Sequence, residues 1–224
     1  MNKEFYKNGY VVLKDTLNFE TAELKEIEKY ISENKNKNFG QNGVLKILSW
    51  EDTEISNKIL NKIVSSIQSN IDFDKKKLLN KFTKKVYYTE DNINTSNRNQ
   101  LLHFDSYPKL KAFIYLSDNS ESGSGSISFA SGSHKSWFMT FINFLRFFYV
   151  PGKHGVQNIL FYHYFIKKLS SIEANGKQYS LVIFNTDTLH KASKIEKKNF
   201  IRKTIRFDFG VYKYPRSILE KLKK

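Results

Sequence analysis

Apolar residues recur at helical spacing in two stretches of the first third of the chain. Residues 15–34 and residues 54–70 both carry apolar side chains three and four positions apart, which gives each stretch one apolar face. A short apolar run, residues 10–13, precedes the first stretch, and the polar, Asn-rich residues 35–42 separate the two. The pattern predicts a short strand followed by two amphipathic packing helices joined by a loop.

The periodicity changes from Lys84 onward. Short apolar or β-branched runs now alternate with turn residues: KVYYT, QLLHFD, LKAFIYL, SISFA, YSLVIFN and IRKTIRFDFGVY. Many short strands with only three Pro in the whole chain favour a closed or two-sheet antiparallel architecture such as a jelly roll. We therefore predict a mainly β fold with flanking helices (α+β), in which the early helices pack on one outer face. With 224 residues, the chain is expected to form a single domain spanning residues 1–224.

An aromatic stretch, residues 137–169, interrupts the predicted strands between SISFA and YSLVIFN. Its first half places apolar side chains at helical spacing: Trp137, Phe138, Phe141, Phe144, Leu145 and Phe148. Pro151 and Gly152 then break the helix, and a second apolar run occupies residues 159–166. We predict a helical hairpin inserted in the barrel at about residues 136–170. Its aromatic residues either cover the barrel mouth or a subunit interface, or they contact a membrane surface or an apolar substrate.

The amino-acid composition excludes several kinds of functional site. The chain has no Cys, which excludes disulfide frameworks, thiolate zinc sites, iron–sulfur clusters and cysteine nucleophiles. Any metal must therefore be bound by His, Asp or Glu. No long apolar stretch follows the first lysine, so a secretory signal is not indicated, and we expect a cytoplasmic protein that contacts the membrane surface, if at all, peripherally.

The chain is basic, with 37 Lys and Arg against 22 Asp and Glu, and residues 150–224 hold 16 of the basic and 5 of the acidic side chains. This excess favours an anionic partner, such as a phosphorylated substrate, a lipid headgroup or a nucleic acid. The alternative is compositional drift, because 32 of the basic residues are Lys and Asn is also abundant.

Three residues are candidates for one metal site. His103 and Asp105 stand two apart in QLLHFD, and residues two apart on a strand project to the same face. His190 follows the apolar strand YSLVIFN and could supply a third ligand from a distant part of the chain. Two His and one carboxylate on one face of an octahedral ion leave open positions, an arrangement typical of non-haem Fe(II) oxygenases.

An arginine follows the last of these residues at a distance of 12 positions. Arg202 lies on the strand IRKTIRFDFG, where its guanidinium could form a two-pronged pair with the distal carboxylate of a dicarboxylic cosubstrate. Alternation with period two puts four polar residues on one face of this strand: Arg202, Thr204, Arg206 and Asp208. We expect that face to line the barrel interior. The opposite register would bury Lys203 and expose the arginines.

These segments, taken in order, resemble the phytanoyl-CoA dioxygenase family of Fe(II)- and 2-oxoglutarate-dependent oxygenases. The resemblance covers almost the whole chain: FYKNGYVVLKDTLNFETAELKEI, QLLHFD, KAFIYLSDNSESGSGSISFASGSHK, LVIFNTDTLHKAS and FIRKTIRFDF. It implies a double-stranded β-helix (a cupin-like jelly roll), with His103, Asp105 and His190 as iron ligands and Arg202 as the anchor of the 2-oxoglutarate 5-carboxylate. It further implies hydroxylation of an unactivated C–H bond with O₂ as a cosubstrate and with formation of succinate and CO₂.

The resemblance also guides minor assignments. Tyr87 and Gln100, on strands flanking the metal, are candidates to donate hydrogen bonds to 2-oxoglutarate, and Arg206 is a candidate to bind an anionic group of the prime substrate. No catalytic residue is predicted beyond the metal ligands. The segment SGSHK has Ser131 where the family usually has Pro, and we expect its His134 to be structural.

The expected substrate is a small or amphiphilic metabolite, including lipid-linked and phosphorylated compounds, with peripheral membrane contact through residues 137–169. Two alternatives remain. One is an oxygenase acting on nucleic acid, which is less favoured because FYKNGYVV and SGSHK match the phytanoyl-CoA branch. The other is a non-catalytic basic binding module on the same fold. The oligomeric state does not follow from the sequence.

Overall fold

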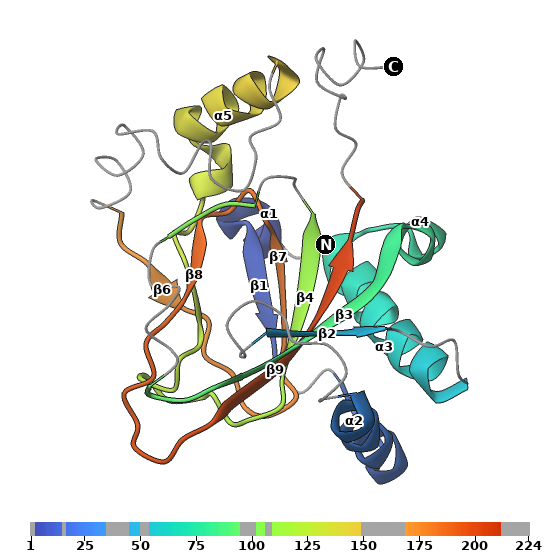
Figure 1. Cartoon of the computed structure of the whole chain (residues 1–224). Coiled ribbons are helices and arrows are strands. Elements are labelled where there is room, and N and C mark those ends of the chain that lie inside the picture. Colours follow the sequence, from blue (N-terminus) through green and yellow to red (C-terminus); the bar gives the residue numbers. More distant parts are fainter. Residues whose placement is uncertain are drawn as a thin grey trace.

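The computed structural model describes residues 3–14, 17–34, 45–49, 54–94, 102–105, 109–148 and 169–211 (Figure 1). The helices are α1 (Lys3–Asn8), α2 (Thr21–Asn34), α3 (Glu54–Ile71), α4 (Lys75–Lys81) and α5 (Trp137–Phe148), with a 3₁₀ turn at Ser133–Lys135. The strands are β1 (Tyr10–Leu13), β2 (Leu45–Ser49), β3 (Phe82–Asp91), β4 (Leu110–Tyr115), β5 (Ile127–Phe129), β6 (Ile172–Glu173), β7 (Leu181–Asn185), β8 (His190–Ala192) and β9 (Arg202–Phe209).

Two antiparallel sheets make up the β structure. The larger has the order β1-β7-β4-β9-β3-β2 and the smaller the order β6-β5-β8. Strands adjacent in space are far apart in sequence, as in β3 beside β9 and β1 beside β7. This confirms the predicted antiparallel two-sheet architecture, which is jelly-roll-like.

The large sheet uses its two faces differently. Ile205, Phe207 and Phe209 of β9 belong to a buried apolar cluster that also contains Ile63 and Ile67 of α3, and Figure 1 shows α3 and α4 on the side away from β5, β6 and β8. Because side chains alternate along a strand, the even-numbered residues of β9 face the small sheet. The register with Lys203 inward is therefore wrong: Lys203 is exposed, whereas Arg202 is buried.

The helices differ from the predicted pattern at the start of α2 and in two additional short helices, α1 and α4. α2 begins at Thr21 rather than at residue 15, because the Glu23 carboxylate accepts a hydrogen bond from the backbone N–H of Glu20 (2.9 Å) and so caps the helix there. α4 was not predicted. It begins after Asp74, whose side chain caps the backbone N–H of Lys77 at 2.7 Å.

The aromatic insertion is described in part. Its first half forms α5, as predicted, whereas residues 149–168 lie outside the described part of the chain. Phe138, Met139 and Ile142 of α5 pack in a buried cluster with Leu102, Phe104 and Leu189. α5 therefore packs against Leu102, Phe104 and Leu189, which lie next to the candidate metal ligands in the sequence. None of the described helices is long and apolar enough to cross a bilayer.

Candidate metal centre

Backbone pairing brings the three predicted metal ligands together. The N–H of His103 donates to the carbonyl of His190 (2.9 Å), and the N–H of His190 donates back to the carbonyl of His103 (2.8 Å). Asp105 is fixed by its N–H, which donates to the carbonyl of Thr186 (3.2 Å). Residues 102–105 make this isolated bridge rather than the regular strand that was predicted, but the alternation holds, since Leu102 and Phe104 are buried on the other side.

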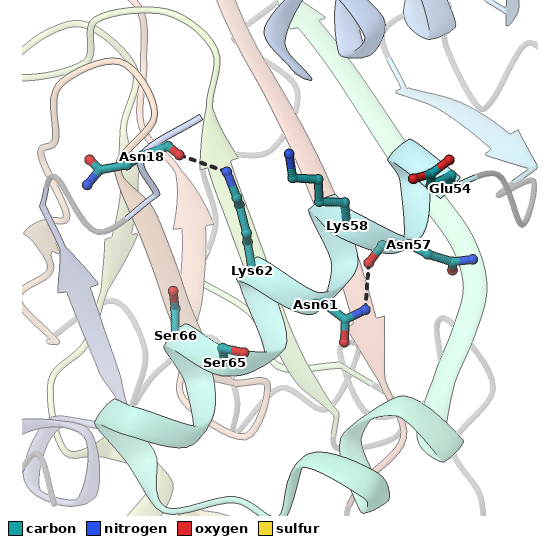
Figure 2. A pocket seen from close by; sticks show the side chains of 8 residues that line it. All are labelled: Asn18, Glu54, Asn57, Lys58, Asn61, Lys62, Ser65 and Ser66. Carbon is teal, nitrogen blue, oxygen red and sulfur yellow. Dashed lines mark hydrogen bonds between the residues drawn. The ribbon is translucent and has the colours of Figure 1, made fainter. Parts of the chain in front are cut away.

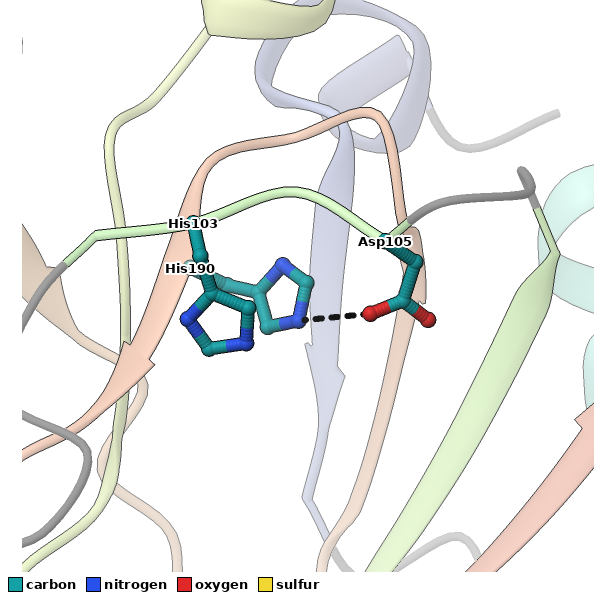
Figure 3. Close-up of side chains that lie close together, drawn as sticks. All are labelled: His103, Asp105 and His190. Carbon is teal, nitrogen blue, oxygen red and sulfur yellow. Dashed lines mark ion pairs between the residues drawn. The ribbon is translucent and has the colours of Figure 1, made fainter. Parts of the chain in front are cut away.

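The ligand atoms of these residues converge (Figure 3). One donor atom from each of His103, Asp105 and His190 can be chosen so that all lie within 4.8 Å of one another. Nε2 of His190 is 3.7 Å from Oδ1 of Asp105, and the two imidazole ring centroids are 4.5 Å apart. Among the described residues, these three are the group of His and carboxylate side chains that could hold a metal ion.

Hydrogen bonding sets the tautomer of His190. Its Nδ1 lies 2.8 Å from the carbonyl oxygen of Thr188, and a carbonyl can only accept, so Nδ1 carries the proton. The lone pair therefore sits on Nε2, which points toward Asp105. Burial is the main cause that lowers the pKa of His190 well below its usual value, and the neighbouring His103 acts in the same direction. A neutral imidazole with its second nitrogen held by a backbone carbonyl is the form that ligates metals.

Asp105 is ionised for a different reason. Burial would raise its pKa, but the ammonium of Lys111, which interacts with the carboxylate through its charge and a hydrogen bond, lowers it, and the net pKa lies below the usual range. Nζ of Lys111 lies 2.6 Å from Oδ2 of Asp105. The site thus offers two imidazole nitrogens and one carboxylate, a donor set that suits Fe(II) and related divalent ions.

Sequence reasoning missed Lys111. It lies on β4 between Leu110 and Ala112, which are both fully buried in the helix-side cluster, so Lys111 faces the small sheet and is itself 6% exposed. The signal was present in KLKAFIYL: a lysine inside an apolar strand must either be exposed or be paired.

Arg202 is buried, and its guanidinium already has protein partners. Nη2 pairs with the carboxylate of Asp91, and Nη1 donates to the carbonyl of Gly125. Gly125 has φ of +76°, and a Cβ there would lie 2.5 Å from Ile195, so only glycine allows this approach. Nε of Arg202 is buried and has no hydrogen-bond partner among the described residues. Nε is therefore the guanidinium nitrogen that remains without a described partner for a ligand to use, whereas the sequence predicted a two-pronged pair with the ligand.

The register between β5 and β8 locates Arg202 relative to the metal ligands. Phe129 of β5 pairs with His190, and Ser124 pairs with Ile195 in continuous register. Gly125, the contact of Arg202, therefore lies four residues from Phe129, or roughly 13 Å along the strand. A ligand that reached Arg202 from the metal would have to extend in this direction between the sheets.

Arg206 and Tyr87 lie nearer to the cluster around Asp105. The guanidinium carbon of Arg206 is 3.8 Å from the ring centroid of Tyr87, and Nε of Arg206 lies 2.9 Å from Oδ1 of Asp208. Asp208 is the β9 residue directly opposite Lys111. The roles predicted for Tyr87 and Arg206 stay predictions, and Gln100 lies outside the described residues.

The other predicted features occupy different places. His134 packs against the turn between α1 and β1, where a Cβ on Gly9 would lie 2.6 Å from its Nδ1, so it takes no part in the metal centre. A solvent-open pocket of about 780 Å³ lies on the outer face of α3 (Figure 2). Its two lysines form ion pairs: Lys58 with Glu20, just before α2, and Lys62 with Glu23 of α2.

On α5, the aromatic side chains of Trp137, Phe141 and Phe144 are exposed.

The sequence matches no protein-family model and no curated protein. Solved structures are nevertheless similar over nearly the whole chain. The α-ketoglutarate-dependent carbocyclase SnoK from nogalamycin biosynthesis has a TM-score of 0.62 at 13% identity, over 99% of this chain and 88% of that one. The epimerase SnoN from the same biosynthesis has a TM-score of 0.60 at 13% identity, over 92% and 80%. HygX from Streptomyces hygroscopicus, with nickel and 2-oxoglutarate bound, has a TM-score of 0.58 at 12% identity, over 94% and 87%.

At these identities the similarity is one of fold, and membership of the phytanoyl-CoA dioxygenase family stays a prediction. The structures that share the fold come from enzymes with different outcomes, a carbocyclase and an epimerase among them. The chain therefore has the jelly-roll-like fold of the iron- and 2-oxoglutarate-dependent oxygenases.

Proposed function

We propose that this protein is an Fe(II)- and 2-oxoglutarate-dependent oxygenase that hydroxylates an unactivated C–H bond of a small or amphiphilic metabolite. The observation that carries the proposal is the convergence of His103, Asp105 and His190, with the lone pair of His190 Nε2 turned toward the Asp105 carboxylate. Such a donor set on one side of an ion leaves positions open for a cosubstrate and O₂.

Buried polar groups near Arg202, between the two sheets, support the proposal that 2-oxoglutarate binds there. Nε of Arg202 is buried without a partner among the described residues, and Thr204, two residues along the same face of β9, is also buried and polar. Buried polar groups are costly unless a ligand or a protein group uses them. In the proposal, Arg202 binds the distal carboxylate of 2-oxoglutarate and Asp91 holds the guanidinium in place.

Each part of the proposed chemistry has a separate source. Iron and 2-oxoglutarate, when bound, would supply the oxidising chemistry with O₂ as the oxidant: one oxygen atom enters succinate as CO₂ is released, and the other enters the hydroxylated product. The protein supplies the geometry: His103, Asp105 and His190 hold the ion, and the aromatic residues Phe129 and Phe184 around His190 keep water away from one side of the site. In the proposal, Arg206, which pairs with Asp208, contacts an anionic group of the prime substrate.

Succinate formation tests the proposal directly. Purified protein is incubated with Fe(II), 2-oxoglutarate and ascorbate, and succinate is measured in the absence of prime substrate and then with pools of metabolites. The wild-type protein should form succinate, and Asp105→Ala and His103→Ala should not. Asp118→Ala, which removes an exposed carboxylate from the turn after β4, is the matched control and should behave as wild type. Failure of the wild-type protein to bind Fe(II) or to form succinate would leave a basic binding module as the better interpretation.

A further inference from the structure

A lysine ammonium lies directly on the candidate metal-ligand carboxylate. Nζ of Lys111 is 2.6 Å from Oδ2 of Asp105, while Oδ1 of the same carboxylate lies 3.7 Å from Nε2 of His190. The two oxygens of Asp105 therefore have different neighbours, an ammonium on one side and an imidazole on the other. Lysine side chains are rarely this buried unless they are paired, and Lys111 is 6% exposed.

The strand fixes where Lys111 points. β4 lies between β7 and β9, and Lys111 is directly opposite Phe184 on one side and Asp208 on the other. Its neighbours Leu110 and Ala112 are anchored in the helix-side core. Lys111 cannot turn to solvent without moving those residues, so its contact with Asp105 is built into the sheet.

The neighbouring cations are bound elsewhere. Nζ of Lys109 lies 3.5 Å from Oδ2 of Asp208, and Nε of Arg206 lies 2.9 Å from Oδ1 of the same carboxylate. Asp208 thus has two cationic partners of its own. Lys111 is the lysine whose ion pair is made with a metal ligand.

We propose that Lys111 is a positioning residue of the metal centre: it holds Oδ2 of Asp105, turns Oδ1 toward the ion, and adds the positive charge that an anionic cosubstrate requires. The inference rests on the proposed function. Two neutral imidazoles and one carboxylate leave a single negative charge, which a divalent ion converts to a single positive charge. Lys111 raises this to two positive charges, which a dicarboxylate dianion neutralises. Counted over the ion, its three ligands and the cosubstrate alone, the same complex without Lys111 would carry one negative charge in a partly buried site.

The variant Lys111→Met tests this, because it keeps the length of the side chain and removes the charge. Two dissociation constants are measured by calorimetry without O₂: that of Mn²⁺ for the metal-free protein, and that of 2-oxoglutarate for the Mn²⁺-loaded protein. We expect the dissociation constant of 2-oxoglutarate to rise on the order of 10- to 100-fold, since a nearby cation is lost in a site of intermediate dielectric. The dissociation constant of Mn²⁺ should stay the same or fall, because the ion no longer shares Asp105 with an ammonium.

A rise in the 2-oxoglutarate constant without a rise in the Mn²⁺ constant separates the proposed role of Lys111 from a merely structural one. Lys109→Met is the matched control: it removes the same charge from Asp208 instead of from Asp105, and both constants should stay within about threefold of wild type. If Lys111→Met does not fold, Lys111→Gln, which can still donate to Oδ2 but is uncharged, is measured in the same way.

Two results would overturn the inference. One is an unchanged 2-oxoglutarate constant in the Lys111 variant, and the other is a parallel loss of both affinities, as expected when a ligand such as Asp105 is removed. A wild-type protein that bound neither Mn²⁺ nor 2-oxoglutarate would instead refute the proposed function, and this outcome is seen before any variant is compared.

Discussion

Replacing Asp91 should destabilise the protein and make its stability respond more strongly to 2-oxoglutarate. Asp91 and Arg202 form a buried ion pair, with 4% and 6% of each residue exposed. Asp91→Ala would leave the guanidinium buried, with the Gly125 carbonyl as its remaining hydrogen-bond acceptor among the described residues. Removing one partner of a buried pair costs about 3–5 kcal/mol. For a chain of this size each kcal/mol lowers Tm by roughly 2–4 °C, so the melting temperature should fall by about 6–20 °C.

The ligand response distinguishes the proposed anchor from an ordinary ion pair. If the distal carboxylate of 2-oxoglutarate binds Arg202, it replaces the missing acidic partner, and 2-oxoglutarate with Mn²⁺ should raise the Tm of Asp91→Ala by more than that of wild type. Pyruvate, which has the 2-oxo acid group but no distal carboxylate, should not. Differential scanning calorimetry of both proteins with each ligand measures this, and Asp118→Ala serves as the control for loss of a carboxylate. Equal effects of pyruvate and 2-oxoglutarate on the variant would refute the assignment of Arg202. Asp91→Asn is the variant to use if Asp91→Ala does not fold.

Other parts of the molecule give further predictions. Glu23 is 3% exposed, and although burial raises its pKa, hydrogen bonds from Lys62 and the Glu20 N–H outweigh burial and lower the pKa. Glu23→Gln should therefore lower the free energy of unfolding by roughly 1–3 kcal/mol at pH 7. The difference from wild type, measured by urea unfolding, should shrink as the pH falls through the lowered pKa and wild-type Glu23 takes up a proton, and a pH-independent difference would contradict this. Phe138→Ala should cost about 3–5 kcal/mol because it opens the cluster behind the metal ligands, and Phe144→Ala, at an exposed site, should cost little by the same assay. The membrane contact predicted for residues 137–169 is tested by flotation with anionic-lipid vesicles: wild type should float with the vesicles and Trp137→Ser should float less. Wild-type protein that does not float at low salt would refute this contact.

The elements that the sequence predicts best are those whose apolar residues repeat regularly over a short stretch of the chain. α3 extends from Glu54 to Ile71, within one residue of the predicted helix, because its apolar residues repeat at helical spacing over several turns. The inward face of β9 followed in the same way from alternation along a single strand. The grouping of the three candidate ligands was predictable because His103 and Asp105 share a local spacing and His190 follows a strongly apolar strand.

The parts that were not predicted depend on partners distant in sequence. Asp91 and Arg202 are 111 residues apart, and neither segment alone shows that the two side chains meet. The N-terminus of α2 was misplaced because the apolar Leu17 extended the helical pattern backwards, while a single side-chain cap decided the start. Lys111 was overlooked for a related reason: its partner Asp105 becomes visible only once β4 and the His103 segment lie beside each other.

Backbone pairing holds the candidate ligands in place. His103 and His190 exchange both of their backbone hydrogen bonds, so the two rings are brought to one side of the chain by sheet pairing alone. α5 closes the reverse side by packing on Leu102, Phe104 and Leu189. Three donors pre-arranged in this way lose little conformational freedom when an ion binds, which favours affinity. The sheet also holds the ammonium of Lys111 against Asp105, so its charge belongs to the surroundings of the candidate centre that the fold builds.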